Sequence, residues 1–274
     1  MAEFSIEVFP PKDNSEADKI FSRLAEFSAL SPDYISVTYR KGGEKFTGEV
    51  ASYIQNELGI PGVAHLTCTW ATRHNMLTTL DNLRQKGIKR ILALRGDVNE
   101  EVKTKDFRYA TDLIEFIKEY GGFEVFVTCY PEGHPDSRDF AEDLNIMKKK
   151  AELGVSNFVS QLFFDNSDFY RMVDSMREWG INTPVQAGIM PLTNIKQILR
   201  IVSLSGAKLP AKLTKMVQKF ENNPEALYQA GLNYAVEQIS DLLINGADGI
   251  HLYSMNNPKL ANYIFESIRP IIKA

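Results

Sequence analysis

Eight short apolar runs constrain the fold of this chain more than any other feature of its sequence. They span residues 5–9, 34–39, 62–67, 90–94, 123–129, 157–164, 184–190 and 249–254. Most are rich in Val, Ile, Phe or Tyr, which is typical of strands buried on both faces. Strands of this kind belong to parallel sheets that are covered by helices.

Amphipathic segments with helical periodicity separate the runs. The first can be capped by Asn14 or Ser15. Its apolar stripe is formed by Ile20, Leu24 and Phe27. Further helices are predicted at residues 48–58, 73–86, 109–120, 138–153, 167–179, 195–204, 211–220, 224–244 and 258–271.

Eight strands, each followed by a helix, predict an α/β fold: one (β/α)8 TIM barrel over residues 1–274. The segment at 211–220 would be an extra helix between strands seven and eight. Such barrels need about 250 residues, which suits this length. An open doubly wound sheet is the alternative, but it has fewer strands and often a Gly-rich turn after the first. Here the first run leads into Pro10 and Pro11, and the chain has no G-x-G-x-x-G motif.

Composition narrows the cellular setting. The chain has 31 Lys and Arg against 35 Asp and Glu, a net charge of −4, so its overall charge predicts no attraction to nucleic acid or anionic membranes. Cys68 and Cys129 form no paired motif, which favours a reduced chain. There is no signal-peptide pattern and no apolar run near the roughly 18 residues of a membrane span. We expect a soluble cytoplasmic protein.

Polar residues gather where the predicted strands end. In a barrel these carboxyl ends carry the active site, although barrel mouths can be polar for other reasons. The residues are Glu7, Thr38, His65, Thr67, Arg95, Gly96, Asp97, the segment 130–134, Gln161 and His251. The sequence therefore predicts a site built from several strands.

Glu7 is a charge inside an apolar strand, between Ile6 and Val8. Burying a carboxylate is costly unless it is paired or protonated. A structural ion pair with Arg95 is one interpretation. A general acid, protonated near neutral pH, is the other.

The fourth strand ends in Arg95, Gly96 and Asp97. Gly96 would let a ligand approach the backbone, Arg95 could bind a phosphate, and Asp97 could accept hydrogen bonds from a heterocycle. His65 and His134 lack a third ligand at fixed spacing, so no metal site is predicted.

Asp143 and Lys150 are seven residues apart and share one face of the fifth predicted helix. The run of three lysines at 148–150 could simply face solvent. Alternatively, Lys150 could reach toward the phosphate of a cofactor.

Eight short motifs together resemble the methylenetetrahydrofolate reductase family. In chain order they are IEVFPP (6–11), SVTY (36–39), HLTC (65–68), ALRGD (93–97), YPEGHP (130–135), QLFFD (161–165), GIMP (188–191) and HLYS (251–254). They span nearly the whole chain. The resemblance is to the catalytic barrel and does not extend to the regulatory domain of the eukaryotic enzymes.

The resemblance implies an FAD-dependent oxidoreductase that reduces 5,10-methylenetetrahydrofolate to 5-methyltetrahydrofolate, a step in one-carbon metabolism and methionine biosynthesis. Hydride would come from N5 of the reduced flavin, with Glu7 as the general acid and Asp97 between flavin and pterin. Gln161 and Gln197 would bind folate. The implied flavin contacts are Thr38, His65, Arg95, Gly96, Asp97, Tyr130, His134, Asp143 and Lys150. NADH or a partner subunit would supply electrons, and the chain could form a homo-oligomer.

Four departures from the family pattern concern the nicotinamide and folate contacts. Ile201 stands where many relatives carry Phe, Asn257 where many carry Arg, and Ile146 where Asn is common; the loop 40–43 also differs. Two further hypotheses therefore stay open. One is a flavin-binding subunit of an electron-transfer complex, and the other is a non-redox barrel methyltransferase linked to folate or cobalamin.

Overall fold

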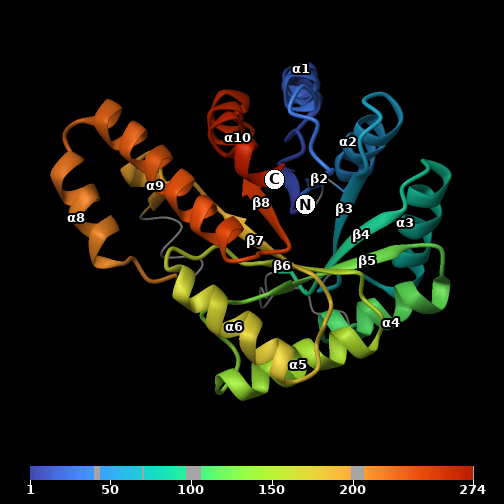
Figure 1. Ribbon diagram of the computed structural model, residues 1–274. Coiled ribbons are helices and arrows are strands. Elements are labelled where there is room, and N and C mark those ends of the chain that lie inside the picture. Colours follow the sequence, from blue (N-terminus) through green and yellow to red (C-terminus); the bar gives the residue numbers. More distant parts are fainter. Residues whose placement is uncertain (40–43, 70, 97–105, 199–206, 274) are drawn as a thin grey trace.

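Eight parallel strands close into a barrel, as the sequence predicts. The computed structural model describes residues 1–39, 44–69, 71–96, 106–198 and 207–273, and in it each strand pairs with the next while β8 pairs with β1 (Figure 1). The strands are β1 (Glu3–Val8), β2 (Tyr34–Val37), β3 (Gly62–Thr67), β4 (Arg90–Leu94), β5 (Glu124–Cys129), β6 (Asn157–Ser160), β7 (Val185–Ile189) and β8 (Gly249–Tyr253).

Helices surround the strands (Figure 1). They are η1 (Asn14–Glu16), α1 (Ala17–Ser28), α2 (Glu44–Asn56), α3 (Arg73–Gln85), α4 (Ala110–Tyr120), α5 (Phe140–Glu152), α6 (Asn166–Glu178), α8 (Ala211–Phe220), α9 (Pro224–Ile244) and α10 (Pro258–Ile272). The extra helix α8 packs beside α9, between β7 and β8, as predicted. Of the helix expected at 195–204, residues 195–198 are helical and the rest lie outside the described residues. None of the described helices has the length and hydropathy that crossing a membrane requires.

The sixth strand is shorter than its apolar run predicts. It ends at Ser160 instead of Phe164, although Leu162, Phe163 and Phe164 are all buried. Leu162 and Phe164 pack in a separate apolar cluster with Leu213 of α8. Their apolar character therefore comes from covering the inserted helix, and the prediction of a longer strand was wrong.

The strands alternate between an apolar outer face and a mixed inner face. Outward residues such as Ile6 and Leu252 join the large cluster between barrel and helices. On the inner face, β2 to β6 supply a small apolar cluster of Tyr34, Val63, Leu92, Phe126 and Val159. Barrel interiors are usually filled by branched aliphatic side chains. Here β1, β7 and β8 place Ser5, Glu7, Gln186 and His251 inside instead, and this polar half carries the candidate site.

Candidate active site

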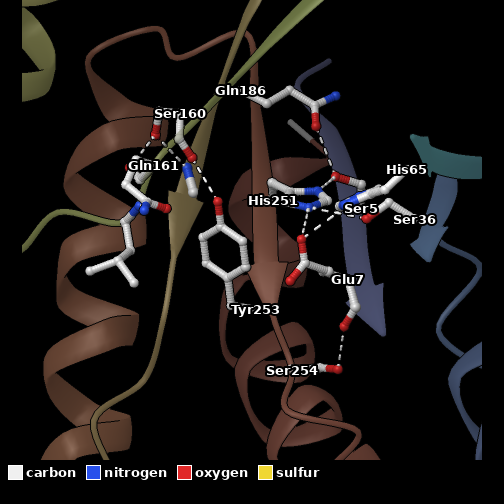
Figure 2. Close-up of polar contacts among 12 residues, drawn as sticks. Ser5, Glu7, Ser36, His65, Ser160, Gln161, Gln186, His251, Tyr253 and Ser254 are labelled. Atoms are coloured by element: carbon white, nitrogen blue, oxygen red, sulfur yellow. Dashed lines mark hydrogen bonds and ion pairs between the residues drawn. The ribbon is translucent and has the colours of Figure 1, made fainter. Parts of the chain in front are cut away.

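Glu7 lies between two histidines at the mouth of the barrel (Figure 2). Its Oε2 atom is 3.8 Å from Nε2 of His65 on β3 and 3.9 Å from Nε2 of His251 on β8. The Glu7 side chain is 14% exposed, so it is shielded but reachable from the mouth. The alternative ion pair with Arg95 is wrong, because Arg95 pairs with Asp136 at 2.6 Å.

Among the described residues, no group hydrogen-bonds to the buried Nε2 atom of His65 or to Oγ1 of Thr67 on the same strand. Burial lowers the pKa of His65 to about 4, although the nearby Glu7 opposes this shift. The imidazole is therefore neutral at neutral pH. Buried polar atoms are normally satisfied, so two such atoms facing one barrel mouth indicate a place where a ligand can bind.

Tyr253 is the register partner of Glu7 on the neighbouring strand β8, and its side chain extends past β7 to the end of β6. Its hydroxyl donates to the backbone oxygen of Ser160 over 2.8 Å (Figure 2). Burial raises the pKa of this phenol well above its usual value, so the hydroxyl is neutral. The ring passes directly over Gly188, where a Cβ atom would stand 2.2 Å from Ser160 O and 2.8 Å from the Tyr253 hydroxyl.

The end of β4 packs closely against the side chain of Thr67 on β3. Gly96 has φ +87°, and a Cβ atom there would lie 2.9 Å from Cβ of Thr67. Thr69 donates from its hydroxyl to the Arg95 carbonyl. Asp97 lies outside the described residues. Thr38 follows β2 directly, and its backbone N–H donates to Val8 O over 3.0 Å.

A pocket of about 330 Å³ opens beside the β5 and β6 ends. Tyr130 and His134 line it, with ring centroids 4.5 Å apart, and Gln161 lies across from them. One cavity thus brings together residues predicted to bind a cofactor and a residue predicted to bind a substrate. Gln197 is not among its lining residues; the Gln197 Oε1 atom accepts from Thr193 Oγ1 at 3.2 Å.

The buried side chains of Asp143 and Lys150 on α5 complete this side of the site. Both are buried, so the hypothesis of a solvent-facing Lys150 is wrong, whereas Lys148 and Lys149 are exposed. Lys150 Nζ donates to Thr128 O over 2.8 Å, and burial lowers its pKa. Asp143 accepts from the His134 N–H at 3.2 Å, and burial raises the pKa of its carboxyl. Among the described residues no three His, Cys, Asp or Glu side chains are grouped to hold a metal ion.

Comparison with known proteins matches this barrel to one family. The family model described as methylenetetrahydrofolate reductase covers residues 1–269. A 5,10-methylenetetrahydrofolate reductase from Pectobacterium carotovorum is 30% identical over 96% of this chain and 89% of its own.

The chain belongs to the methylenetetrahydrofolate reductase family.

Two further similarities are to a plant relative and to a solved structure. The relative named methylenetetrahydrofolate reductase (NADH) 1 from Arabidopsis thaliana is 34% identical over 94% of this chain but only 47% of its own, so this chain spans about half of that plant relative. A solved Clostridium thermocellum protein, described as binding two copies of 5-methyl-5,6,7,8-tetrahydrofolic acid, has a TM-score of 0.66 at 14% identity and covers 99% of this chain and 96% of its own. At that identity the likeness concerns the fold.

The departures from the methylenetetrahydrofolate reductase pattern have different structural settings. Asn257 caps α10, where its side chain accepts from the Leu260 N–H at 3.3 Å. The position therefore serves as a helix N-cap in this chain. Ile146 is half-buried on α5. Ile201 and the loop 40–43 lie outside the described residues.

Sequence reasoning missed two residues that shape the site, Ser5 and Gln186, and gave no role to Gly188 and Tyr253, which stand in two of the family motifs. Ser5 and Gln186 point into the barrel, so both could have been found from the two-residue alternation of their strands. What the sequence does not reveal is which of them meet, because Ser5 and Gln186 are 181 residues apart.

Proposed function

We propose that this chain binds FAD at the barrel mouth and reduces 5,10-methylenetetrahydrofolate to 5-methyltetrahydrofolate. The observation that carries the proposal is a shielded carboxyl group, Glu7, flanked by two buried histidines in a barrel of this family. A carboxyl group in such a setting is suited to general acid chemistry.

The described residues fit a flavin nucleotide. His65 Nε2 and Thr67 Oγ1, which have no partner among the described residues, offer hydrogen bonds. Gly96 would let the nucleotide approach the backbone at the end of β4. Arg95 and the buried Lys150 would supply positive charge for the phosphates. Tyr130 and His134 line the pocket and Asp143 bonds to His134, while Thr38 would contact the nucleotide from the end of β2. When bound and reduced, the flavin would supply the hydride.

Glu7 would deliver the proton that makes the substrate reactive. The methylene group of the substrate bridges two nitrogens of tetrahydrofolate, N5 of the pterin ring and N10 of the p-aminobenzoate group. Proton transfer from Glu7 to N10 breaks the bond between the methylene carbon and N10, leaving a methylene iminium at N5. This cation accepts a hydride at carbon and becomes the 5-methyl product, while Glu7 is left as a carboxylate to be protonated again.

The remaining residues would orient the substrate. Gln161 lines the pocket, and its amide suits the hydrogen-bonding edge of a pterin. Asp97 would place negative charge near the developing cation, and Gln197 would contact folate from the helical segment after β7. NADH or an electron-donating protein would reduce the flavin; a plant relative is named for NADH.

Reconstitution with FAD under anaerobic conditions tests the proposal. The protein should bind FAD, become yellow and bleach with dithionite, and the colour should return when methylenetetrahydrofolate is added. Comparison of NADH, NADPH and dithionite identifies the donor. A protein without flavin affinity would support the non-redox methyltransferase instead. A flavoprotein that bleaches but is inert toward the folate would support the electron-transfer subunit.

A further inference from the structure

A continuous set of hydrogen bonds crosses the barrel interior from its N-terminal end to His251, whose Nε2 atom lies 3.9 Å from Glu7 Oε2. Glu3 and Glu7 lie on the same strand, roughly 13 Å apart at about 3.3 Å per residue. Between them, the side chains of Gln186, Ser5 and His251 are linked one to the next (Figure 2). The direction in which each bond donates can be worked out from the chemistry of its partners.

The Glu3 carboxylate fixes the first link. Gln186 donates from Nε2 to Glu3 Oε2, and a carboxylate can only accept. The Gln186 amide therefore turns its Oε1 atom into the barrel. This oxygen has no hydrogen, so it accepts from Ser5 Oγ at 2.8 Å and from the Tyr34 hydroxyl at 2.5 Å. Burial raises the pKa of Tyr34 well above its usual value, which keeps that hydroxyl a donor.

The Ser5 hydroxyl fixes the second link. Its single hydrogen is directed at oxygen acceptors, Gln186 Oε1 and, at 3.3 Å, Ile250 O. Ser5 Oγ lies 2.7 Å from His251 Nδ1. Because the hydroxyl hydrogen is used elsewhere, Ser5 Oγ accepts at this contact and Nδ1 carries the hydrogen.

The remaining nitrogen of His251 faces the reacting carboxyl group. His251 is fully buried. In a neutral ring with hydrogen on Nδ1, Nε2 carries a lone pair. That nitrogen lies 3.4 Å from Ser36 Oγ and 3.9 Å from Glu7 Oε2. The other titratable groups around it are His65, Tyr34 and Tyr253, with Glu3 and Arg90 toward the far end.

We propose that the bonds from Glu3 through Gln186 and Ser5 lock His251 in the tautomer with hydrogen on Nδ1, so that Nε2 presents an acceptor to Glu7. A carboxylic acid can donate to that acceptor, whereas a carboxylate can only be repelled by it. His251 is thus a positioning residue that supports the acid form of Glu7, and in this respect the inference rests on the proposed function. Through His251, Glu3 and Gln186 at the opposite end of the barrel would also influence the surroundings of Glu7.

Nitrogen NMR of ¹⁵N-histidine-labelled protein tests the tautomer without any turnover. The chain has four histidines, and His251→Gln identifies the signal of interest. We expect His251 to show a protonated Nδ1 and an unprotonated Nε2. The reverse tautomer, or two protonated nitrogens, would overturn the inference.

Gln186→Met tests the role of the distant link. It removes the acceptor at 2.8 Å, so the Ser5 hydrogen can turn to His251 Nδ1, which is nearer than Ile250 O. We expect the His251 hydrogen to move to Nε2. The folate half-reaction should slow by roughly 10-fold, as when outer hydrogen-bond partners of a site residue are removed. The pH at which the rate of the folate half-reaction is half-maximal should fall, because an N–H group that faces Glu7 favours the carboxylate form.

Gln238→Met is the matched control. It makes the same change at another buried glutamine, whose amide donates to Phe163 O over 3.1 Å outside this set of bonds, so the tautomer and the pH profile should stay as in the wild type. An unchanged tautomer in a folded Gln186→Met protein would overturn the inference. If that variant does not fold, the wild-type spectrum still decides. A wild-type protein with the expected tautomer but no folate reduction would instead contradict the proposed function.

Discussion

The carboxyl group of Glu7 has two buried imidazoles within 4 Å and no cationic partner in the described chain. Glu7→Gln keeps the side chain's size but removes its transferable proton. We expect FAD affinity and reduction by dithionite to be unchanged, while flavin reoxidation by the folate slows by about 10²–10⁴-fold, the usual contribution of a general acid. Rapid-reaction absorbance measures both half-reactions, and a wild-type reoxidation rate would show that Glu7 is not the acid.

The buried His65 makes the free energy of unfolding depend on pH. Its pKa in the folded protein is about 4, because burial disfavours the charged ring. An unfolded histidine titrates near 6.5, so between pH 6.5 and 4 the unfolded chain binds a proton that the folded chain does not, and stability falls as pH falls.

His65→Asn should therefore reduce the stability lost between pH 7 and 5 by about 2 kcal/mol, judged by urea unfolding. His74→Asn, at an exposed position, is the control and should leave that loss unchanged. Equal pH dependence in all three proteins would contradict a buried neutral His65.

At the scale of the elements, β7 approaches β6 and β8 too closely for any side chain at Gly188. Gly188→Ala should destabilise the fold by about 1–3 kcal/mol, the usual cost of overpacking, and displace Tyr253 from Ser160. Gly48→Ala on helix α2 is the control, where the nearest atom is 3.4 Å away and helix propensity favours alanine. Thermal unfolding of both variants measures the difference; equal melting temperatures would refute the packing argument.

Helix α5 brings its one buried lysine to the end of β5. Lys150→Met keeps an unbranched side chain but removes the charge, and loss of a charge-assisted phosphate contact should weaken FAD binding by on the order of 1.5–3 kcal/mol. Lys149→Met, at the exposed neighbouring position, should bind FAD normally. If titration with FAD gives the same dissociation constant for Lys150→Met and the wild type, Lys150 does not bind the phosphate and serves only to hydrogen-bond Thr128 O.

For the whole molecule, the sequence was sufficient to predict the barrel and the mouth that holds Glu7, His65 and Tyr130. Buried strands are visible as apolar runs, and the carboxyl ends of parallel strands meet at one side. The end of β6 was not predictable, because Leu162 is apolar for packing against α8 and not for strand pairing. The Ser5 to Gln186 contact was also hidden, since it depends on how β1 and β7 are staggered across the closed barrel.

We propose that this barrel holds a reduced flavin that would pass a hydride to methylenetetrahydrofolate, with Glu7 as the acid. The most direct measurement is an anaerobic single turnover, in which protein with fully reduced FAD is mixed with methylenetetrahydrofolate and the products are separated. We expect one 5-methyltetrahydrofolate to form per flavin oxidised, at a rate that Glu7→Gln lowers and Gln238→Met does not. Recovery of unchanged folate with the flavin still reduced would contradict it.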